Sequence, residues 1–532
     1  MKSVLKQKTE EILNQEEVLR QGGGKDGHDR QRRNGRLPVR ERLSLLFDKN
    51  SPTFELGIWA GYEMYKEWGS FPAAGVVTII GKVSGKICMV IANDATVKAG
   101  AMFPQSIKKT LRAQRIAFEN KLPILYLVDS SGVFLPLQDE IFPDEDDFGR
   151  IFRNNAILSA NGIPQFAAIM GNCIAGGGYL PVLCDKLLMT KGSGLYLAGP
   201  ALVKAAIGQE IETEALGGAE MHATISGTVD FVEENDESCL KRLRKLVDML
   251  PNDIDWNFSK LPQPQQNIND VYSIMNESAS GYDMREIIYC IVDKDSAEEY
   301  KANFGKSIIT MFAKINNQPI GIVANQRKPT KTSSGKIEIG GVIYTESADK
   351  IARFVMDCNQ MKIPILFLQD VSGFMVGREA EQSGIIKSGA KVVNAISNSI
   401  VPKITIIIGN SFGAGHYALC GRAYDPHFIF AWPNTKYAVM GADQASDTIF
   451  TIQQKSADRK KDSLKKDEAN AQRLKVKESY ETQMDIRYGA ARGWVDAIIP
   501  PHETREILTH ILQLVKRSPI TERKFHTGVL QV

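Results

Sequence analysis

Two stretches of the sequence, IPQFAAIMGNCIAGGGY at residues 163–179 and VPKITIIIGNSFGAGHY at residues 401–417, decide the fold. Each places a proline before an apolar run of strand length and ends in a turn of small residues. Pro402 follows Pro164 at an offset of 238 residues. A repeat with so long a period indicates two copies of one fold and not the short unit of a solenoid.

Two further matches keep nearly the same offset. GKVSGKICMVIAND at 81–94 aligns with AKINNQPIGIVANQ at 313–326, offset 232, and LPILYLVDSSGVF from Leu122 aligns with IPILFLQDVSGFM from Ile363, offset 241. Amphipathic stretches at 106–120 and 347–360 predict a helix between the first two strands of each half. Two unrelated Rossmann-like domains would not share order, spacing and turn sequences. We therefore predict an α/β fold made of two duplicated domains of βαβ units.

The boundary between the halves is expected in LPQPQQNINDVY at 261–272, which is rich in Pro, Gln and Asn. This gives an N-terminal domain of residues 1–265 and a C-terminal domain of residues 266–532. The densely charged stretch at 454–481 has no counterpart in the first half. Its mixed charges predict a solvated helix and not a nucleic-acid patch.

Composition excludes several classes of protein. A chain of 532 residues with 43% apolar and 24% charged residues is typical of a globular protein with two domains. The net charge of +3 predicts neither nucleic acid nor a membrane as partner. Seven scattered cysteines without metal-ligand spacing predict a reducing compartment and no metal site. An N-terminus without an apolar run, and apolar stretches too short for a membrane span, predict a cytoplasmic protein.

The small-residue turns, Ala175 to Gly178 and Gly413 to Gly415, are the candidate chemical apparatus. Small residues let the backbone approach a ligand and leave amide N–H groups uncovered at the start of a helix. Such a turn can form an oxyanion hole, in which one donor contributes about 2.7 to 4 kcal/mol. A single turn of this kind is equally compatible with a purely structural role. Its repetition at equivalent positions favours function.

Motifs for other chemistries are missing from the sequence, which has no GxxxxGK[ST], HExxH or GxSxG. Backbone donors therefore suit the chain better than a side-chain nucleophile. His222, His416 and His502 are isolated in sequence, and we predict structural roles for them. Of the three, His416 is the one that could have a functional role, because it lies beside the second turn.

The segments NDATVKAGAMFPQSIKKTLRAQRIA, GNCIAGGGY, SGFMVGRE, GIIKSGAKVVNAIS and YAVMGADQAS resemble those of acyl-CoA carboxylase β subunits, most closely the 3-methylcrotonoyl-CoA branch. The resemblance runs from about residue 34 to residue 499. It implies two crotonase-like (ββα superhelix) domains that move a carboxyl group from carboxybiotin to an acyl-CoA, here in leucine degradation. By the same resemblance, the amides of Gly176 and Gly177 hold the thioester enolate, and those of Ala414 and Gly415 hold the ureido oxygen of biotin.

The resemblance also implies binding residues. Those for acyl-CoA are Thr96, Val97, Lys98, Lys108, Arg112 and Ser347; those for biotin are Phe374, Gly384 and Ile385. The basic residues among them are equally compatible with the solvent face of a helix. Neither an ATP-grasp domain nor an AMKM biotin-attachment motif is found. The chain is therefore expected to need a biotinylated α subunit, which alone uses ATP, and to form a β hexamer within an α6β6 complex.

Alternatives remain open. Propionyl-CoA or geranyl-CoA could be the substrate, or the chain could serve a decarboxylase of the glutaconyl-CoA type. A biotin-independent crotonase-like hydratase or isomerase would need a carboxylate near a glycine turn. Two departures from the methylcrotonoyl pattern bear on the substrate: the long stretch RKPTKTSSGKIEIG at 327–340, and His416 in place of the usual Asn.

Overall fold

The computed structural model describes residues 3–251, 262–276, 281–332, 334–460, 466–518, 524–529 and 531. The chain divides into two compact units. The N-terminal unit comprises Asn14–Trp256 and Ala490–Gly493, and the C-terminal unit comprises Met1–Leu13, Asn257–Gly489 and Trp494–Val532. Leu261, at the start of the predicted linker, and residues 461–465 of the predicted charged helix lie outside the described residues.

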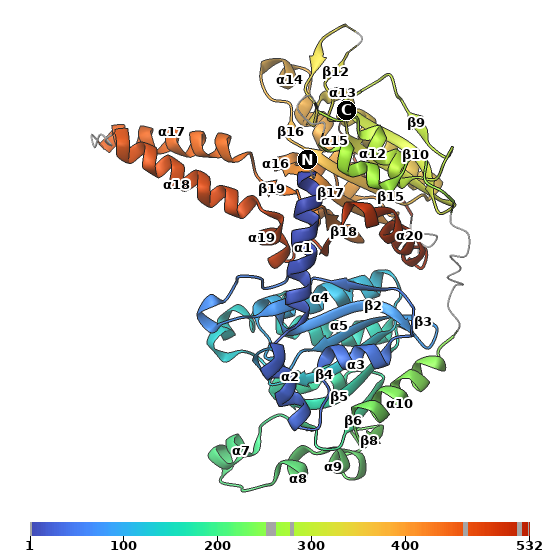
Figure 1. The fold of residues 1–532 in the computed structure, drawn as a ribbon, viewed down its shortest axis with the longest axis vertical. Helices are drawn as coiled ribbons and strands as arrows, with labels where there is room; N and C mark the ends of the chain where they lie inside the picture. The colour runs from blue at the N-terminus through green and yellow to red at the C-terminus, as the bar shows by residue number, and fades with distance from the viewer. Residues whose placement is uncertain are drawn as a thin grey trace. The chain divides into compact units, whose positions relative to one another are not determined.

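The N-terminal unit is built on one eight-stranded sheet (Figure 1). Its strand order is β1-β2-β3-β4-β5-β6-β8, with β7 paired to β5. The first three strands are antiparallel and the pairs from β3 onward are parallel. The strands are β1 (Thr53–Leu56), β2 (Val76–Val83), β3 (Lys86–Asn93), β4 (Ile124–Ser130), β5 (Gln165–Ile174), β6 (Lys186–Thr190), β7 (Gly194–Tyr196) and β8 (Phe231–Glu233).

The C-terminal unit repeats this topology. Its eight-stranded sheet has the order β9-β10-β11-β15-β17-β18-β20, with β19 paired to β17, and again two antiparallel pairs precede the parallel ones. The strands are β9 (Glu298–Tyr300), β10 (Ile308–Ile315), β11 (Gln318–Asn325), β15 (Ile365–Val371), β17 (Lys403–Phe412), β18 (Phe428–Ala431), β19 (Lys436–Ala438) and β20 (Ala497–Ile498). The predicted α/β fold and its duplication are confirmed.

Helices pack on both sheets because the central parallel strands are buried throughout. All seven residues of β4 and of β15 are buried, as expected for strands covered on both faces. In the N-terminal unit, apolar residues of α3 and α10 join those of the strands in one core cluster. The helices of this unit are α2 (Gly24–Arg33), α3 (Val39–Leu46), α4 (Pro104–Glu119), α5 (Phe148–Ala160), α6 (Tyr179–Val182), α7 (Pro200–Ile207), α8 (Thr213–Gly217), α9 (Ala219–Thr224) and α10 (Asp236–Asp248).

In the C-terminal unit, α13 and α15 supply the helical side of the main core cluster. Helices α4 and α13 confirm the two predicted amphipathic helices to within two residues at each end. The helices are α11 (Val271–Ile274), α12 (Met284–Ile291), α13 (Thr345–Met361), α14 (Arg378–Gln382), α15 (Ile385–Ser397), α16 (Gly413–Ala418), α17 (Ala442–Lys460), α18 (Lys466–Met484) and α20 (Thr504–Val515); α1 (Val4–Arg20) and α19 (Ile486–Ala491) each contribute residues to both units.

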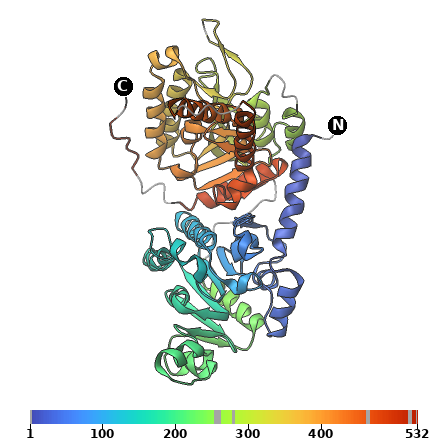
Figure 2. The ribbon, with the colours of Figure 1, turned by 90° about the vertical axis from the view of Figure 1, so that its left-hand side faces the viewer.

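Two insertions distinguish the C-terminal unit. Helices α17 and α18 run side by side as a hairpin, seen in orange and red in Figure 1 and facing the viewer in Figure 2. The stretch 327–340 carries the short antiparallel strands β12 (Thr330–Lys331) and β13 (Ile337–Glu338). In the described part of the chain, no helix has both the length and the apolar character needed to cross a membrane.

Candidate functional site

The two glycine turns occupy equivalent places in the two sheets. Strand β5 runs into a 3-10 helix at Ala175–Gly178, and β17 runs into α16. The first residue of each turn, Ala175 and Gly413, has a positive φ, 59° and 54°. The two halves thus reverse the chain with the same backbone geometry. At the start of a helix, N–H groups lack acceptors within the helix itself and are available to a ligand.

The surroundings of the two turns differ. A Cβ on Gly415 would lie 2.5 Å from Val371 Cγ2, so only glycine fits there without a shift. A Cβ on Gly176 or Gly177 would meet Phe148 at 3.8 or 3.9 Å, an ordinary contact distance. Gly415 is buried, whereas Gly176 and Gly177 are partly exposed and Ala414 is exposed. The second turn is therefore packed more tightly than the first.

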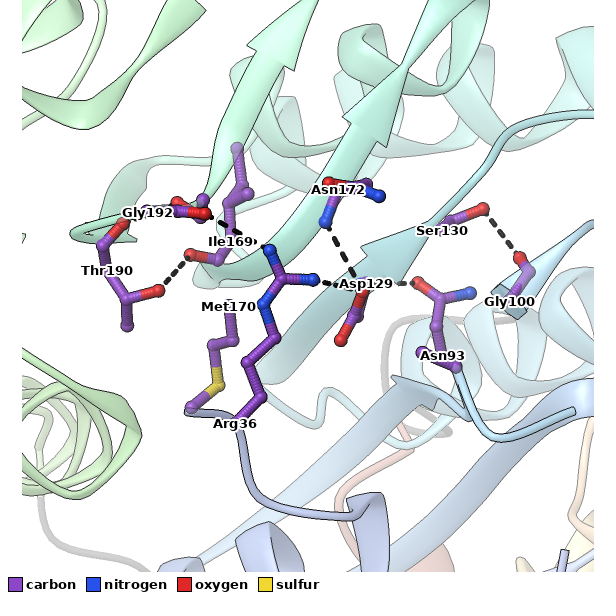
Figure 3. A network of polar contacts seen from close by, with 12 residues as sticks. Arg36, Asn93, Gly100, Asp129, Ser130, Ile169, Met170, Asn172, Thr190 and Gly192 are labelled. Atoms are coloured by element: carbon purple, nitrogen blue, oxygen red, sulfur yellow. Dashed lines mark hydrogen bonds and ion pairs between the residues drawn. The ribbon is translucent and has the colours of Figure 1, made fainter. Parts of the chain in front are cut away.

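A buried aspartate lies beside the strand that leads into the first turn (Figure 3). Asp129, at the end of β4, accepts the Asn172 N–H at 3.3 Å and pairs with Arg42 at 3.3 Å and Arg36 at 3.6 Å. The Asp129 N–H donates to Asn93 Oδ1 at 3.4 Å. Burial raises the pKa of Asp129, and the two guanidinium groups oppose this rise.

The C-terminal unit repeats this arrangement. Asp370 accepts the Asn410 N–H at 2.8 Å and the Tyr282 hydroxyl at 2.7 Å, and pairs with Arg327 at 3.2 Å. Its own N–H donates to Asn325 Oδ1 at 3.3 Å. Burial, together with the neighbouring carboxylate, raises the pKa of Tyr282 well above its usual value. Each turn is therefore supported by an aspartate of the adjacent strand.

Comparison with known proteins places the chain in a family. The family model for the carboxyl transferase domain matches residues 30–528. The chain belongs to the carboxyl transferase family. The chain is 41% identical over 505 residues to the biotin-dependent 3-methylcrotonyl-coenzyme A carboxylase beta1 subunit of Mycobacterium tuberculosis, covering 94% of this chain and 92% of the relative.

Two other similar proteins extend this result. The mitochondrial methylcrotonoyl-CoA carboxylase beta chain of Arabidopsis thaliana is 41% identical over 514 residues, covering 95% of this chain and 85% of the relative. The crystal structure of the geranyl-CoA carboxylase beta subunit of P. aeruginosa superposes with a TM-score of 0.86 at 32% identity, covering 99% of this chain and 96% of that one. The resemblance to acyl-CoA carboxylase β subunits and the crotonase-like fold are confirmed.

The residues of this carboxyl transferase predicted to bind acyl-CoA fall into two groups. Thr96 and Val97 are buried, and the Thr96 hydroxyl bonds to Asp94 Oδ1 at 2.5 Å and to the Gly23 N–H at 2.9 Å. Lys98 is exposed and its ammonium donates to the Trp68 carbonyl. Along α4, Lys108 is exposed and donates to the Arg492 carbonyl at 2.6 Å, and Arg112 is partly exposed.

Ser347 is fully buried at the start of α13. Its hydroxyl accepts the Tyr344 N–H at 2.8 Å, so it caps the helix. Ser106 does the same for α4 by accepting the Phe103 N–H at 3.0 Å. The Ser347 hydroxyl thus bonds to the backbone at the start of its own helix. Ser106 occupies the equivalent position in the N-terminal unit.

Lys109 and Lys350 form a second duplicated feature. The Lys109 ammonium donates to the Ala73 carbonyl at 3.0 Å, and the Lys350 ammonium donates to the Ile308 carbonyl at 2.9 Å. Burial lowers the pKa of Lys109 to about 7 and that of Lys350 to about 8. A glutamate held by two hydrogen bonds from one arginine lies nearby in each unit, Glu55 with Arg40 and Glu299 with Arg285.

The predicted biotin residues lie around the start of α15. Gly384, with φ 83°, directly precedes this 13-residue helix, and Ile385 is buried as its first residue. Phe374 is partly buried, and a Cβ on Gly389 of α15 would lie 3.3 Å from its ring. Phe374 pairs with Ile343 of β14 (Val342–Ile343) through the short strand β16 (Gly373–Phe374).

His416 is buried in the second turn. Its Nδ1 lies 2.8 Å from Ser411 Oγ, and its Nε2 bonds to the Tyr437 hydroxyl and receives the Arg422 N–H at 3.3 Å. Burial lowers its pKa to about 4. A neutral ring tied to three neighbours indicates a structural role.

Sequence reasoning missed Asp129 and Asp370, although both stand in aligned stretches, LVDSSGVF and LQDVSGFM. The signal was the repetition of one acidic residue near the end of a mostly apolar strand, since a buried charge requires specific partners.

Proposed function

We propose that the chain is a carboxyltransferase subunit that moves a carboxyl group from a biotin carrier to 3-methylcrotonoyl-CoA. The observation that carries the proposal is the 41% identity, across 94% of the chain, to a subunit named for that substrate. A methylmalonyl-CoA carboxyltransferase subunit is 32% identical over a similar share of the chain. The identity therefore favours methylcrotonoyl-CoA over methylmalonyl-CoA chemistry.

In this proposal the first turn stabilises negative charge on the substrate. Removal of a proton from the γ carbon of methylcrotonoyl-CoA delocalises charge onto the thioester oxygen. Amides of Gly176 and Gly177 would donate to that oxygen, and donors fixed before the reaction need no reorganisation as the charge develops. Backbone donors are insensitive to pH, unlike a side-chain acid.

The second turn offers backbone donors that fit biotin. The amides of Ala414 and Gly415 lie in the first turn of α16, and the lack of a Cβ on Gly415 keeps the chain close against Val371. N–H donors suit a neutral carbonyl oxygen such as that of the ureido ring. Biotin would supply the carboxyl group, with Phe374, Gly384 and Ile385 proposed to border it.

For acyl-CoA we retain the exposed Lys98 and Lys108 and the partly exposed Arg112 as proposed phosphate contacts. Buried Thr96, Val97 and Ser347 would contribute through the backbone that they position. We retain N- and C-terminal domains divided at residue 265 as a proposal. The two compact units divide the chain after residue 256, with residues 1–13 in the C-terminal unit and Ala490–Gly493 in the N-terminal unit.

We also propose a biotinylated α subunit as partner, and a β hexamer in which the N domain of one copy works with the C domain of another. Helix α7 supports an assembly of copies. Its sequence, PALVKAAI, is largely apolar, yet none of its residues is buried, and Leu202 and Ile207 are 60% and 72% exposed. Exposed apolar surface of this kind marks an interface with another molecule.

The rival hydratase or isomerase would need a carboxylate free to handle protons near a turn. Carboxylates do lie there, Asp129 and Asp370, but they are 3% and 4% exposed and are bonded to backbone N–H and guanidinium groups. This geometry suits support of the backbone better than proton transfer.

The test is a labelled-bicarbonate assay of the chain together with a biotinylated partner and ATP. We expect fixation with methylcrotonoyl-CoA at a kcat/KM at least about tenfold above that with geranyl-, propionyl- or acetyl-CoA. Fixation led by another acyl-CoA would correct the substrate. Failure with all four, in a correctly assembled complex, would refute the proposed reaction, and hydration of crotonyl-CoA without biotin would favour the rival.

A further inference from the structure

The ladder between neighbouring parallel strands is interrupted at one place in each sheet. Val128 pairs with Ile169, but the next pair is Ser130 with Cys173, so three residues of β5 stand opposite Asp129 alone. In the other unit Gln369 pairs with Ile407 and then Val371 pairs with Ser411, so three residues of β17 stand opposite Asp370. Such irregularities redirect a strand and leave backbone groups without ladder partners.

In both bulges the aspartate side chain takes over the hydrogen bonding. It accepts the N–H of the last bulged residue, Asn172 in one unit and Asn410 in the other. Each of these asparagines precedes the positive-φ residue of its glycine turn by three positions. The carboxylate therefore bonds to the backbone directly upstream of the turn.

The sequence leaves room for each carboxylate in the same way. A Cβ on Gly171 would lie 2.0 Å from Asp129 Oδ1, and a Cβ on Gly409 would lie 2.4 Å from Asp370 Cγ. The other partners of the carboxylate, by contrast, differ between the halves. Arg42 and Arg36 face Asp129, whereas Tyr282 and Arg327 face Asp370. Both halves share the contact between the aspartate and the bulge. They differ in the other groups that bond to the carboxylate.

We propose that Asp129 and Asp370 are positioning residues, each holding the bulge that aims the glycine turn of its own unit. The catalytic consequence rests on the proposed function, in which these turns supply amide donors to acyl-CoA and biotin. Neither carboxylate needs to touch a substrate, since each acts through the backbone of Asn172 or Asn410.

Two matched controls separate positioning from general stability. Asp236 is equally buried, pairs with the same Arg42 at 2.7 Å and bonds to the Leu37 N–H, away from the turn. Asp293 is buried in the C-terminal unit, pairs with Arg505 at 2.6 Å and accepts N–H groups of the hairpin at 316–317. Replacing Asp293 removes a buried carboxylate without touching a bulge. Replacing Asp236 removes one while Asp129 stays in place at the bulge, and it also removes a partner of Arg42, which donates to the Met170 carbonyl of that bulge.

The experiment measures amide hydrogen exchange across the full chain for Asp→Ala and Asp→Asn at all four positions. We expect Asp129→Ala to accelerate exchange at 172–178 about tenfold or more and to leave 410–416 unchanged. Asp370→Ala should show the reverse. The Asn variants keep one acceptor oxygen, so they should recover part of the protection and remain informative where an Ala variant does not fold.

The same variants are then assayed for carboxylation. We expect kcat to fall at least about tenfold for Asp129→Asn and Asp370→Asn while the acyl-CoA KM changes less than about twofold, because displaced oxyanion donors act on the transition state. Asp236→Asn and Asp293→Asn should lower only the thermal midpoint. Turn exchange equal to that of these controls would overturn the proposal. The exchange measurement requires no substrate, so it decides the positioning claim even if the wild-type chain carboxylates no acyl-CoA.

Discussion

Lys109 shows how much one buried side chain can change the response of the fold to pH. Its pKa, 10.5 in an unstructured chain, falls to about 7 because burial disfavours the ammonium. Between these values the unfolded chain binds more protons than the folded one, so this group makes stability rise with pH from about 7 toward 10.5. Below about 7 both states are protonated and the dependence from Lys109 ends.

Lys109→Met should therefore flatten the stability profile. We expect the rise of the unfolding midpoint between about pH 7 and about pH 10 to be smaller in the variant than in the wild type. Denaturant unfolding at several pH values measures it, with Lys49→Met at an exposed position as control. Parallel profiles for wild type and Lys109→Met would show that the buried ammonium is not the cause.

The two turns should respond differently to a single added methyl group. Gly415→Ala places a Cβ 2.5 Å from Val371, so we expect a loss of about 1 to 3 kcal/mol in the free energy of unfolding and a lower kcat. Gly176→Ala makes only an ordinary contact with Phe148 and reproduces the alanine found at position 414. We expect its unfolding free energy to change by less than about 0.5 kcal/mol.

Denaturant unfolding and carboxylation rates of both variants provide the check. Equal destabilisation by the two substitutions would mean that the tight contact of Gly415 with Val371 does not determine the packing of its turn.

At the scale of elements, the capping serines distinguish structural from binding roles. Ser106→Ala and Ser347→Ala each remove an acceptor from the N–H of the residue that precedes the helix, at 3.0 and 2.8 Å. We expect each to lower the free energy of unfolding by about 1 kcal/mol, the usual cost of a lost helix cap. Thermal unfolding and the acyl-CoA KM should be measured together. A KM raised far more by Ser347→Ala than by Ser106→Ala would indicate direct contact of Ser347 with acyl-CoA.

The elements that could be predicted from sequence are those with a strong periodic signal. Apolar runs predicted the strands that end at Asn93, Ser130 and Ile174, and amphipathic spacing predicted helix α4. The same patterns recur in the second half of the chain and supported each prediction a second time. The bulges at Asp129 and Asp370 could not be predicted, because a register shift depends on tertiary partners such as Arg42 and Tyr282. The burial of Thr96 could not be predicted either, since it depends on Gly23, which precedes α2, and Gly27 within α2 packing against it.

At the scale of the whole molecule, duplication explains why the turns match while their partners differ. The strand order, the Ser caps, the buried Lys and the Asp at the bulge are the same in both units. The charge partners of the Asp and the packing of the turn have diverged. Features that set the backbone are therefore kept, and features that surround the turn vary.

The division of the chain into units leads to the last prediction. Residues 1–13 belong to the C-terminal unit, where the Ser3 hydroxyl donates to the Tyr272 carbonyl at 3.0 Å and Glu11 pairs with Arg487 at 2.6 Å. Leu5 is 4% exposed, whereas the neighbouring Val4 is 61% exposed. The first helix thus contributes apolar contacts to a unit whose remaining residues begin more than 240 positions later.

Leu5→Ala should therefore destabilise the C-terminal unit by about 2 to 5 kcal/mol, the usual cost of truncating a buried leucine. Val4→Ala, one position earlier, should change stability by less than about 0.5 kcal/mol. Hydrogen exchange after Leu5→Ala should rise in 266–276 and 486–489 while 124–130 in the N-terminal unit stays protected, because local stability follows the contacts that are lost. Exchange that rises equally in both units would contradict the assignment of residues 1–13 to the C-terminal unit.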